Sequence, residues 1–168
     1  MTRKIGLGGG CHWCTEAIFQ SLKGVTKVEQ GYISSSGKDS YFSEGVLVTY
    51  EPETIPLKTL IEIHLLTHEA TSNHSFRKKY RSAIYFLAPE DESASLIALK
   101  TLQKDFEKPL ITQVLPFAEF EASRLSLQDY YFSNPEKPFC QRYIKPKIQL
   151  LLNRFGKEVD SSKFGKEN

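Results

Sequence analysis

Near its amino terminus the chain reads Ile5-Gly6-Leu7-Gly8-Gly9-Gly10-Cys11-His12-Trp13-Cys14-Thr15-Glu16. The apolar residues 5–7 predict a short strand, the glycines mark a junction, and a helical pattern begins at Cys11. A cysteine at the start of a helix lies where the first free backbone N–H groups point outward. The positive end of the helix dipole favours a thiolate there, and the thiolate is the reactive form. The stretch therefore predicts a strand–helix unit that carries a reactive cysteine.

The rest of the chain continues this alternation of strands and helices. Further strands are predicted at 25–33, 45–50, 82–87 and 111–120, and helices at 11–23, 56–68, 89–106 and 146–155. Two successive strands after the first helix favour an α+β fold over a doubly wound parallel sheet, which is the alternative. We expect a two-layer sandwich in which helices flank a mixed, mostly antiparallel sheet with a ferredoxin-like core.

The composition is that of an ordinary globular protein. We assign residues 1–157 to a single domain and residues 158–168 to a polar, frayed tail. A formal net charge of +2 is too small to indicate a nucleic-acid or acidic-membrane partner. The sequence contains neither an apolar run long enough to span a bilayer nor an apolar signal core after its first residues. We expect a monomer in the cytoplasm.

The three cysteines, Cys11, Cys14 and Cys140, are an odd set, which argues against a secreted disulfide framework. Cys11 and Cys14 form a C-x-x-C pair, as in thioredoxin-like redox sites. Cys14 also falls on the apolar stripe of the predicted helix, so we favour a packing role for it. His64 and His68 lie on the core-facing side of their helix, and no second ligand pair lies in a loop, so we expect no metal.

Several motifs together make the sequence similar to one family. They are Gly10-Cys11-His12-Trp13-Cys14-Thr15-Glu16, Leu22-Lys23-Gly24-Val25, Gly31-Tyr32, Glu44-Gly45-Val46-Leu47-Val48-Thr49-Tyr50-Glu51-Pro52, His68-Glu69-Ala70-Thr71, Tyr80-Arg81-Ser82-Ala83-Ile84-Tyr85, Gln128-Asp129-Tyr130-Tyr131 and Pro138-Phe139-Cys140. In this order they resemble the A-type peptide methionine-S-sulfoxide reductases over roughly residues 5–150. A match of several motifs in one order is far more specific than a single C-x-x-C.

The resemblance implies a reductase of methionine (S)-sulfoxide, without a cofactor, that serves repair under oxidative stress. Cys11 would be the nucleophile that attacks the sulfoxide sulfur, and Glu44 the acid that protonates the oxygen. Tyr41 and Tyr80 match tyrosines whose hydroxyls can hydrogen-bond that oxygen. Trp13 would hold the substrate methyl group by apolar contact.

The resemblance also implies how the cycle is completed. Attack would leave Cys11 as a sulfenic acid, which condenses with a second thiol to a disulfide. Cys140 matches the resolving cysteine of the family, and the proline-bearing stretch before it predicts a mobile loop or tail. Thioredoxin or a similar dithiol would then reduce the disulfide. Cys14 is the alternative resolving cysteine, although on a regular helix it would need local distortion to reach Cys11.

The sequence departs from the family pattern around the expected pocket. His12 follows the nucleophile where the family usually has phenylalanine, which makes the substrate pocket more polar. Tyr41 and Glu44 are only three residues apart, and Ser75 stands where the family has an aspartate. Two alternatives follow: a divergent protein that binds a ligand or senses oxidants with little turnover, or a general thiol–disulfide oxidoreductase that uses Cys11 and Cys14. Retention of Glu44, Tyr80 and Trp13 together favours the reductase.

Overall fold

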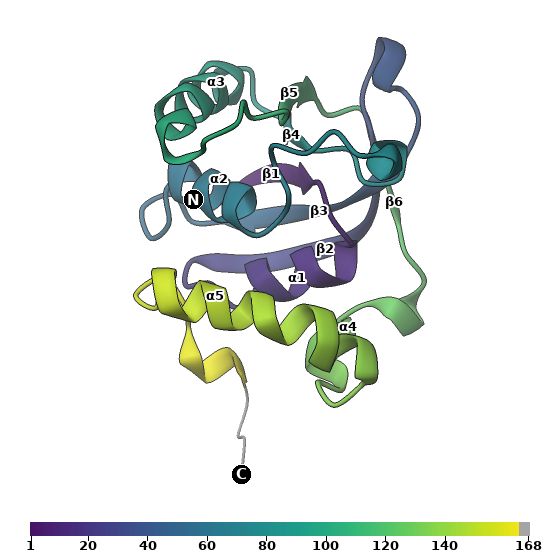
Figure 1. The fold of residues 1–168 in the computed structure, drawn as a ribbon, viewed down its shortest axis with the longest axis vertical. Helices are drawn as coiled ribbons and strands as arrows, with labels where there is room; N and C mark the ends of the chain where they lie inside the picture. Colours follow the sequence, from purple (N-terminus) through teal and green to yellow (C-terminus); the bar gives the residue numbers. More distant parts are fainter. Residues whose placement is uncertain (165–168) are drawn as a thin grey trace.

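A computed structural model, which describes residues 1–164, has a six-stranded sheet at its centre, with helices packed against it (Figure 1). The strands are β1 (Arg3–Gly8), β2 (Val25–Ser34), β3 (Ser43–Tyr50), β4 (Ala83–Phe86), β5 (Gln113–Pro116) and β6 (Glu119–Ala122). The helices are α1 (His12–Gln20), α2 (Leu57–Leu66), α3 (Glu90–Leu102), α4 (Tyr130–Ser133) and α5 (Lys145–Phe155). A π-helical turn, η5 (Cys140–Ile144), precedes α5, and short 3₁₀ turns are η1 (Gly37–Asp39), η2 (Ser75–Lys78), η3 (Gln103–Asp105), η4 (Leu125–Leu127) and η6 (Ser161–Phe164).

The strand order across the sheet is β5-β4-β1-β3-β2-β6. Every pairing is antiparallel except that of β4 with β5. The first four strands and two helices follow one another as β1-α1-β2-β3-α2-β4, and their strands lie side by side in the order β4-β1-β3-β2. This is a ferredoxin-like arrangement, and the predicted α+β fold with a mixed, mostly antiparallel sheet is confirmed.

The two faces of the sheet are filled differently. The helix-covered face buries alternating strand residues such as Ile5 and Leu7 against apolar residues of α1 and α2. On the other face β1 presents glycines, because a large side chain already covers that position: a Cβ on Gly6 would lie 2.9 Å from the Cβ of Tyr85. Tyr85 and Ile33 form a second small core there. The absence of a side chain at Gly6 thus leaves room for the side chains of Tyr85 and Ile33 on this face of the sheet.

The single strand predicted at 111–120 is wrong, because the structure divides it into β5 and β6. β5 pairs with β4 at one edge of the sheet, whereas β6 pairs with β2 at the other. Pro116 ends β5, and residues 117–118 carry the chain from one edge to the other. Periodicity along the sequence could not show this because each half keeps a strand-like pattern. The third helix also ends earlier than predicted, at Leu102.

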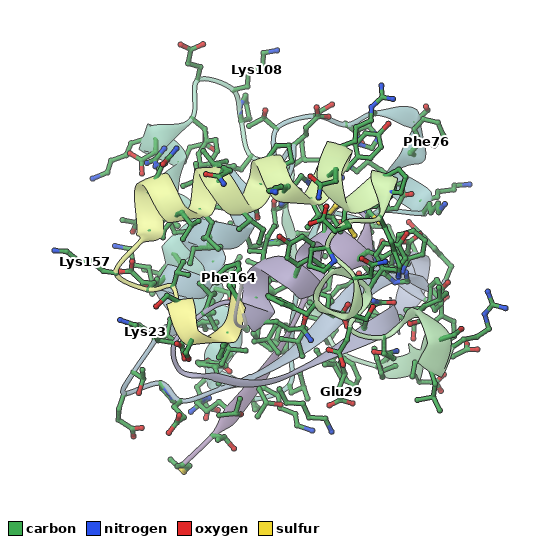
Figure 2. All side chains as sticks on the ribbon, turned by 90° about the horizontal axis from the view of Figure 1, so that it is seen from below. Lys23, Glu29, Phe76, Lys108, Lys157 and Phe164 are labelled. Atoms are coloured by element: carbon green, nitrogen blue, oxygen red, sulfur yellow. The ribbon has the colours of Figure 1, made fainter. Side chains whose placement is uncertain are left out.

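The C-terminal segment runs back across the helix-covered face, where α5 lies beside α1 (Figure 1). Beyond α5, Val159 is buried and forms an isolated β-bridge with Leu22. Lys163 donates hydrogen bonds to the carbonyls of Leu22 and Val25. Phe164, labelled in Figure 2, contacts Phe132. Part of the segment assigned to a tail is thus packed on the domain, and residues 165–168 of the predicted frayed end lie outside the described residues.

Within residues 1–164 no helix combines the length and apolar character needed to cross a membrane.

The close approach of β6 to β2 at Gly31 yields a stability prediction. A Cβ on Gly31 would run into the carbonyl oxygen of Glu121 and would lie 2.9 Å from the Cα of Ala122. Gly31→Ala should therefore lower the free energy of unfolding by about 1–3 kcal/mol, because β6 must shift to make room. Chemical denaturation measures this change. Glu119→Ala, at an exposed position of β6, is the control and should stay within about 0.5 kcal/mol of the wild type. Equal stability of both variants would contradict the assigned close approach.

Candidate active site

The glycine junction sets the position of Cys11. Gly9 has φ +150°, a conformation that side chains other than that of glycine rarely adopt. A Cβ on Gly9 would also lie 2.5 Å from the ring of His68. The chain then reaches Cys11, which is the N-cap of α1, so the helix begins at His12, one residue later than predicted. Cys11 thus stands just outside the helix, at its positive end.

The Cys11 sulfur is half-buried and surrounded by groups that favour its thiolate. The thiol of Cys14 and the backbone N–H groups of Trp13 and Cys14 lower the pKa of Cys11 below its ordinary value. Burial and the carboxylate of Glu44 oppose this shift but are outweighed. The predicted reactive cysteine is therefore placed where its ionised form is stabilised.

Cys14 is buried one helical turn further on, and its thiol acts on Cys11. Its own pKa is raised far above the ordinary value, first by Cys11 and then by burial, which keeps Cys14 protonated. Because Cys11 is the N-cap, a bond between the two sulfurs does not have to form within a regular helix. A disulfide between Cys11 and Cys14 therefore needs less distortion than the sequence indicates, and Cys14 both packs in the core and contacts Cys11.

Cys140 is held in a helical turn and not in the predicted mobile loop or tail. It begins the π-helical turn η5 and its side chain is 0% exposed, within the core that also contains Cys14. Burial raises the pKa of the Cys140 thiol. A charge on Cys140 also raises the pKa of Cys14, so the two thiols are electrostatic neighbours. π-Helical turns are rare and occur frequently at functional sites.

Two hollows meet at Cys11. The smaller, of about 500 Å³, is lined by Cys11, His12, Trp13, Tyr32, Phe42, Ser43, Glu44, Lys79, Tyr80, Leu127 and Phe139. The larger, of about 760 Å³, lies on the other side of Cys11 and is lined by Gly9, Gly10, Cys11, Cys14, Leu66, Thr67, His68, Glu69, His74, Phe76, Tyr80, Phe139, Tyr143, Lys147 and Leu150. Its outer rim includes Phe76, which is 65% exposed and projects at the periphery of Figure 2. A small molecule in the first hollow would meet the thiol and the carboxyl group together.

Glu44 on β3 faces the start of α1. Its Oε1 accepts a hydrogen bond from the backbone N–H of His12 at 3.2 Å and lies 3.4 Å from Nε2 of the His12 ring. Lys79 approaches the other oxygen at 3.7 Å from the exposed surface. The Glu44 side chain is only 8% exposed. The structure therefore brings Cys11, His12 and Glu44 together, as the sequence predicts.

The predicted aromatic residues divide into two groups. Tyr80 and Trp13 line the smaller hollow, and one face of Trp13 is stacked on Tyr130 with ring centroids 4.1 Å apart. Tyr41 is not among the lining residues: its ring packs on Arg81, in a different hollow. Tyr32 lines the site instead, and its ring centroid lies 5.3 Å from that of His12 in an edge-to-face arrangement. The Gly31-Tyr32 motif is the sequence feature that points to Tyr32, but by itself it does not indicate that Tyr32 lines the site.

Glu16, at the end of the opening motif, is a residue whose role the sequence reasoning missed. It is 1% exposed and accepts hydrogen bonds from Gln30 Nε2 and from the backbone N–H groups of Asp129 and Tyr130. Burial raises its pKa. Glu16 thereby ties α1 to the segment that carries Tyr130 over Trp13. An acidic residue on the buried side of an amphipathic helix is the signal that could have found it.

A buried chain of hydrogen bonds, made by His64 and His68, fixes the position of the glycine junction. His64 Nε2 donates to the carbonyl of Gly8 at 2.7 Å, and His68 bonds to the His64 carbonyl and to Ser82 Oγ. Burial lowers the pKa of His64 to about 4 and that of His68 well below its ordinary value. His64 Nδ1 has no hydrogen-bond partner, so the neutral ring fits this place and a second proton does not. Within residues 1–164 no group of three His, Cys, Asp or Glu could hold a metal ion.

Comparisons with known proteins give a consistent result. The family model described as peptide methionine sulfoxide reductase matches residues 3–159. The peptide methionine sulfoxide reductase MsrA of Deinococcus radiodurans is 32% identical, over 90% of this chain and 81% of that protein. Among solved structures, reduced Mxr1 from Saccharomyces cerevisiae superimposes with a TM-score of 0.74 at 22% identity, covering 83% of this chain and 89% of Mxr1. Mxr1 in complex with Trx2 gives a TM-score of 0.60 at 22% identity, covering 77% and 84%.

The tight fit between Gly9 and His68 predicts an unequal response of two neighbouring glycines. Gly9→Ala should lower the free energy of unfolding by about 1–3 kcal/mol, because its Cβ meets a ring held by two hydrogen bonds and its φ is strained. Gly10→Ala is the matched control, since its Cβ would have no neighbour nearer than 3.8 Å. Denaturant unfolding compares the two. A Gly10→Ala loss as large as that of Gly9→Ala would refute the assignment.

The buried His64 predicts a stability that depends on pH. Because its folded pKa of about 4 lies below the ordinary 6.5, the unfolded chain takes up the proton first as the pH falls. As the pH falls from 6.5 to 4, the His64 ring should therefore lower the free energy of unfolding by about 1.4 kcal/mol for each pH unit. His64→Gln, whose amide can still donate to the Gly8 carbonyl, should remove the His64 contribution to this slope and leave that of His68. Unfolding curves between pH 4.5 and 7 measure it, and an unchanged slope would contradict the buried neutral ring.

Proposed function

The chain belongs to the peptide methionine sulfoxide reductase family, and from this premise we propose that it reduces methionine (S)-sulfoxide to methionine with Cys11 as nucleophile. The observation that carries the proposal is the meeting of a stabilised Cys11 thiolate and the buried Glu44 carboxyl in one hollow. A sulfoxide needs both groups, because its sulfur must be attacked while its oxygen gains a proton.

The site supports each part of this reaction. Cys11 donates an electron pair to the sulfoxide sulfur, and the proton held at Glu44 passes to the oxygen. The net change converts the sulfoxide to the thioether and Cys11 to its sulfenic acid. Tyr80 lines the same hollow and is proposed to hydrogen-bond the oxygen, and the rings of Trp13 and Phe139 form its apolar side. The proposed roles of Tyr80, Trp13 and Phe139 in binding the substrate follow from their position in the same hollow as Cys11.

The sulfenic acid then needs a second thiol. We take Cys140 as this partner: its thiol attacks Cys11, water leaves, and an intramolecular disulfide forms. Two observations support this role. A charge on Cys140 raises the pKa of Cys14, the neighbour of Cys11, and Cys140 begins a π-helical turn. Because Cys140 is buried, η5 must open for the disulfide to form. Cys14 is the rival partner, favoured by its direct effect on Cys11.

A dithiol reductant of the thioredoxin type is proposed to reopen the disulfide. The yeast Mxr1 of the same fold was solved in complex with Trx2, which supports such a partner. We place the reaction in the cytoplasm, because the three free cysteines are suited to a reducing compartment. The acid beside the thiol favours a reductase over a general thiol–disulfide oxidoreductase, whose exchange chemistry needs no such proton donor.

Three cysteine variants test the proposal. Cys11→Ser should abolish reduction of methionine (S)-sulfoxide, both free and within an oxidised peptide. Cys140→Ser should retain one turnover but lose multiple turnovers with thioredoxin, whereas Cys14→Ser should retain both. Mass spectrometry of the oxidised wild type should find Cys11 joined to Cys140.

The outcomes separate the two levels of the proposal. A Cys11–Cys14 bond, together with loss of thioredoxin-dependent turnover in Cys14→Ser alone, would overturn the role of Cys140 and leave the reductase standing. Absence of any reduction by the wild type, in single-turnover as well as in multiple-turnover assays, would overturn the reductase itself.

A further inference from the structure

We propose that His12 shares one proton with Glu44 and holds it beside the Cys11 sulfur, so that the imidazole is a positioning residue for the acid of the reaction. The inference rests on the proposed function. His12 stands directly after the nucleophile, where the resemblance leads one to expect an apolar ring. Its side chain is 5% exposed, so its polar atoms must be satisfied within the protein.

The first ring nitrogen settles the tautomer. Nδ1 of His12 lies 2.8 Å from the backbone carbonyl of Gly31. A carbonyl oxygen can only accept a hydrogen bond, so Nδ1 carries a proton in every charge state of the ring. In the neutral ring, Nε2 is therefore an acceptor with a lone pair.

The second ring nitrogen faces a carboxylate oxygen. Nε2 of His12 lies 3.4 Å from Oε1 of Glu44, and the two side chains are 5% and 8% exposed. Without a proton between them, two lone pairs would face each other in a site that water barely enters. One proton removes this conflict, either as an imidazolium beside a carboxylate or as a carboxylic acid beside a neutral imidazole. The pair is thus a store for a single proton.

Other charged groups around the pair do not take over this role. Lys79 approaches Oε2 of Glu44 at 3.7 Å, but its side chain is 63% exposed and solvent screens its charge. Cys11, at the start of α1, feels the Glu44 charge, which raises the Cys11 pKa. Tyr32 from β2 and Tyr80 from the segment before β4 complete the titratable groups that line this hollow. A proton on the pair offsets the carboxylate charge that disfavours the thiolate.

This arrangement supplies what the sulfoxide needs. The Cys11 thiolate and the protonated pair coexist before attack. The Cys11 sulfur bonds to the substrate sulfur with its electron pair, and the shared proton moves to the oxygen. The S–O bond then breaks, the hydroxyl passes to the Cys11 sulfur and the S–S bond breaks, which leaves the thioether and the Cys11 sulfenic acid. The pair is reloaded when the reductant returns Cys11 as a thiol that ionises. No further oxidant or reductant enters this step.

The pair also sets the pH at which the acid is lost. A free imidazole is a stronger base than a free carboxylate by about two pKa units. Replacing His12 therefore removes the stronger base from the site and leaves the Glu44 carboxylate alone to hold the proton.

A direct test follows the imidazole nitrogens by NMR, independently of turnover. The chain has 4 histidines, and the signal lost in His12→Asn assigns His12. In the wild type we expect Nδ1 to carry a proton throughout and the Nε2 signal to report a proton shared with Glu44, which Glu44→Gln should remove. An Nε2–H neutral tautomer in the wild type, or the same Nε2 signal in Glu44→Gln, overturns the proposal.

A kinetic test reports whether the proton is used. The probe is N-acetyl-methionine (S)-sulfoxide in single turnover between pH 5 and 9. His12→Asn is the matched variant, because its amide can still donate a hydrogen bond to the Gly31 carbonyl but has no ionisable proton to share with Glu44. We expect the alkaline fall in rate to begin at least about one pH unit lower in His12→Asn and in His12→Phe than in the wild type.

The outcomes are distinct from failure of the proposed function. A reductase whose alkaline limb is the same with and without the imidazole overturns the role of His12 but not the reductase. Were neither variant to fold, the NMR spectra of the wild type and Glu44→Gln would still decide the shared proton. A wild type that shows the shared proton but reduces no sulfoxide would keep the pair and overturn the proposed function.

Discussion

The buried carboxylate of Glu16 is the interaction on which the arrangement of the site depends. It accepts hydrogen bonds from the side-chain amide of Gln30 on β2 and from the backbone N–H groups of Asp129 and Tyr130. A carboxylate removed from water is costly unless such donors surround it, so the three segments are held together as a unit. The consequence is that α1, which Cys11 caps, and the C-terminal segment that leads to Cys140 are fixed on the same side of the sheet. Two thiols 129 positions apart, at 11 and 140, therefore share one core.

A second constraint acts just before the start of α1. The Gly8–Gly10 junction must pass over the ring of His68 with no side chain at Gly9, while His64 holds the Gly8 carbonyl. Close packing leaves the junction little freedom. The nucleophile is thus fixed by backbone geometry and buried neutral imidazoles rather than by contacts of its own side chain. Backbone N–H groups at the start of the helix can then stabilise its thiolate without reorganisation.

The hollow beside Cys11 is more polar than an apolar methyl cage. Trp13 offers its ring, but one face is covered by Tyr130, and the opposite wall is the His12–Glu44 pair with the edge of Tyr32. A histidine in this position exchanges apolar contact with the substrate for control of a proton. The larger hollow shares Cys11, Tyr80 and Phe139 with this site, so Cys11 lies at the border of both hollows.

The sequence by itself determined the ferredoxin-like order of elements and placed a cysteine where the first helix starts, because hydrophobic period, glycine positions and helix ends are local properties. It also brought Cys11, Glu44 and Tyr80 into one hypothesis, since each lies in a motif. Only the tertiary structure decided what depends on contacts across the chain. It divided residues 111–120 between two sheet edges, replaced Tyr41 with Tyr32 beside the thiol and buried Cys140. It also turned His12 toward Glu44, because the direction of a side chain and its partner is set by packing, which no local pattern encodes.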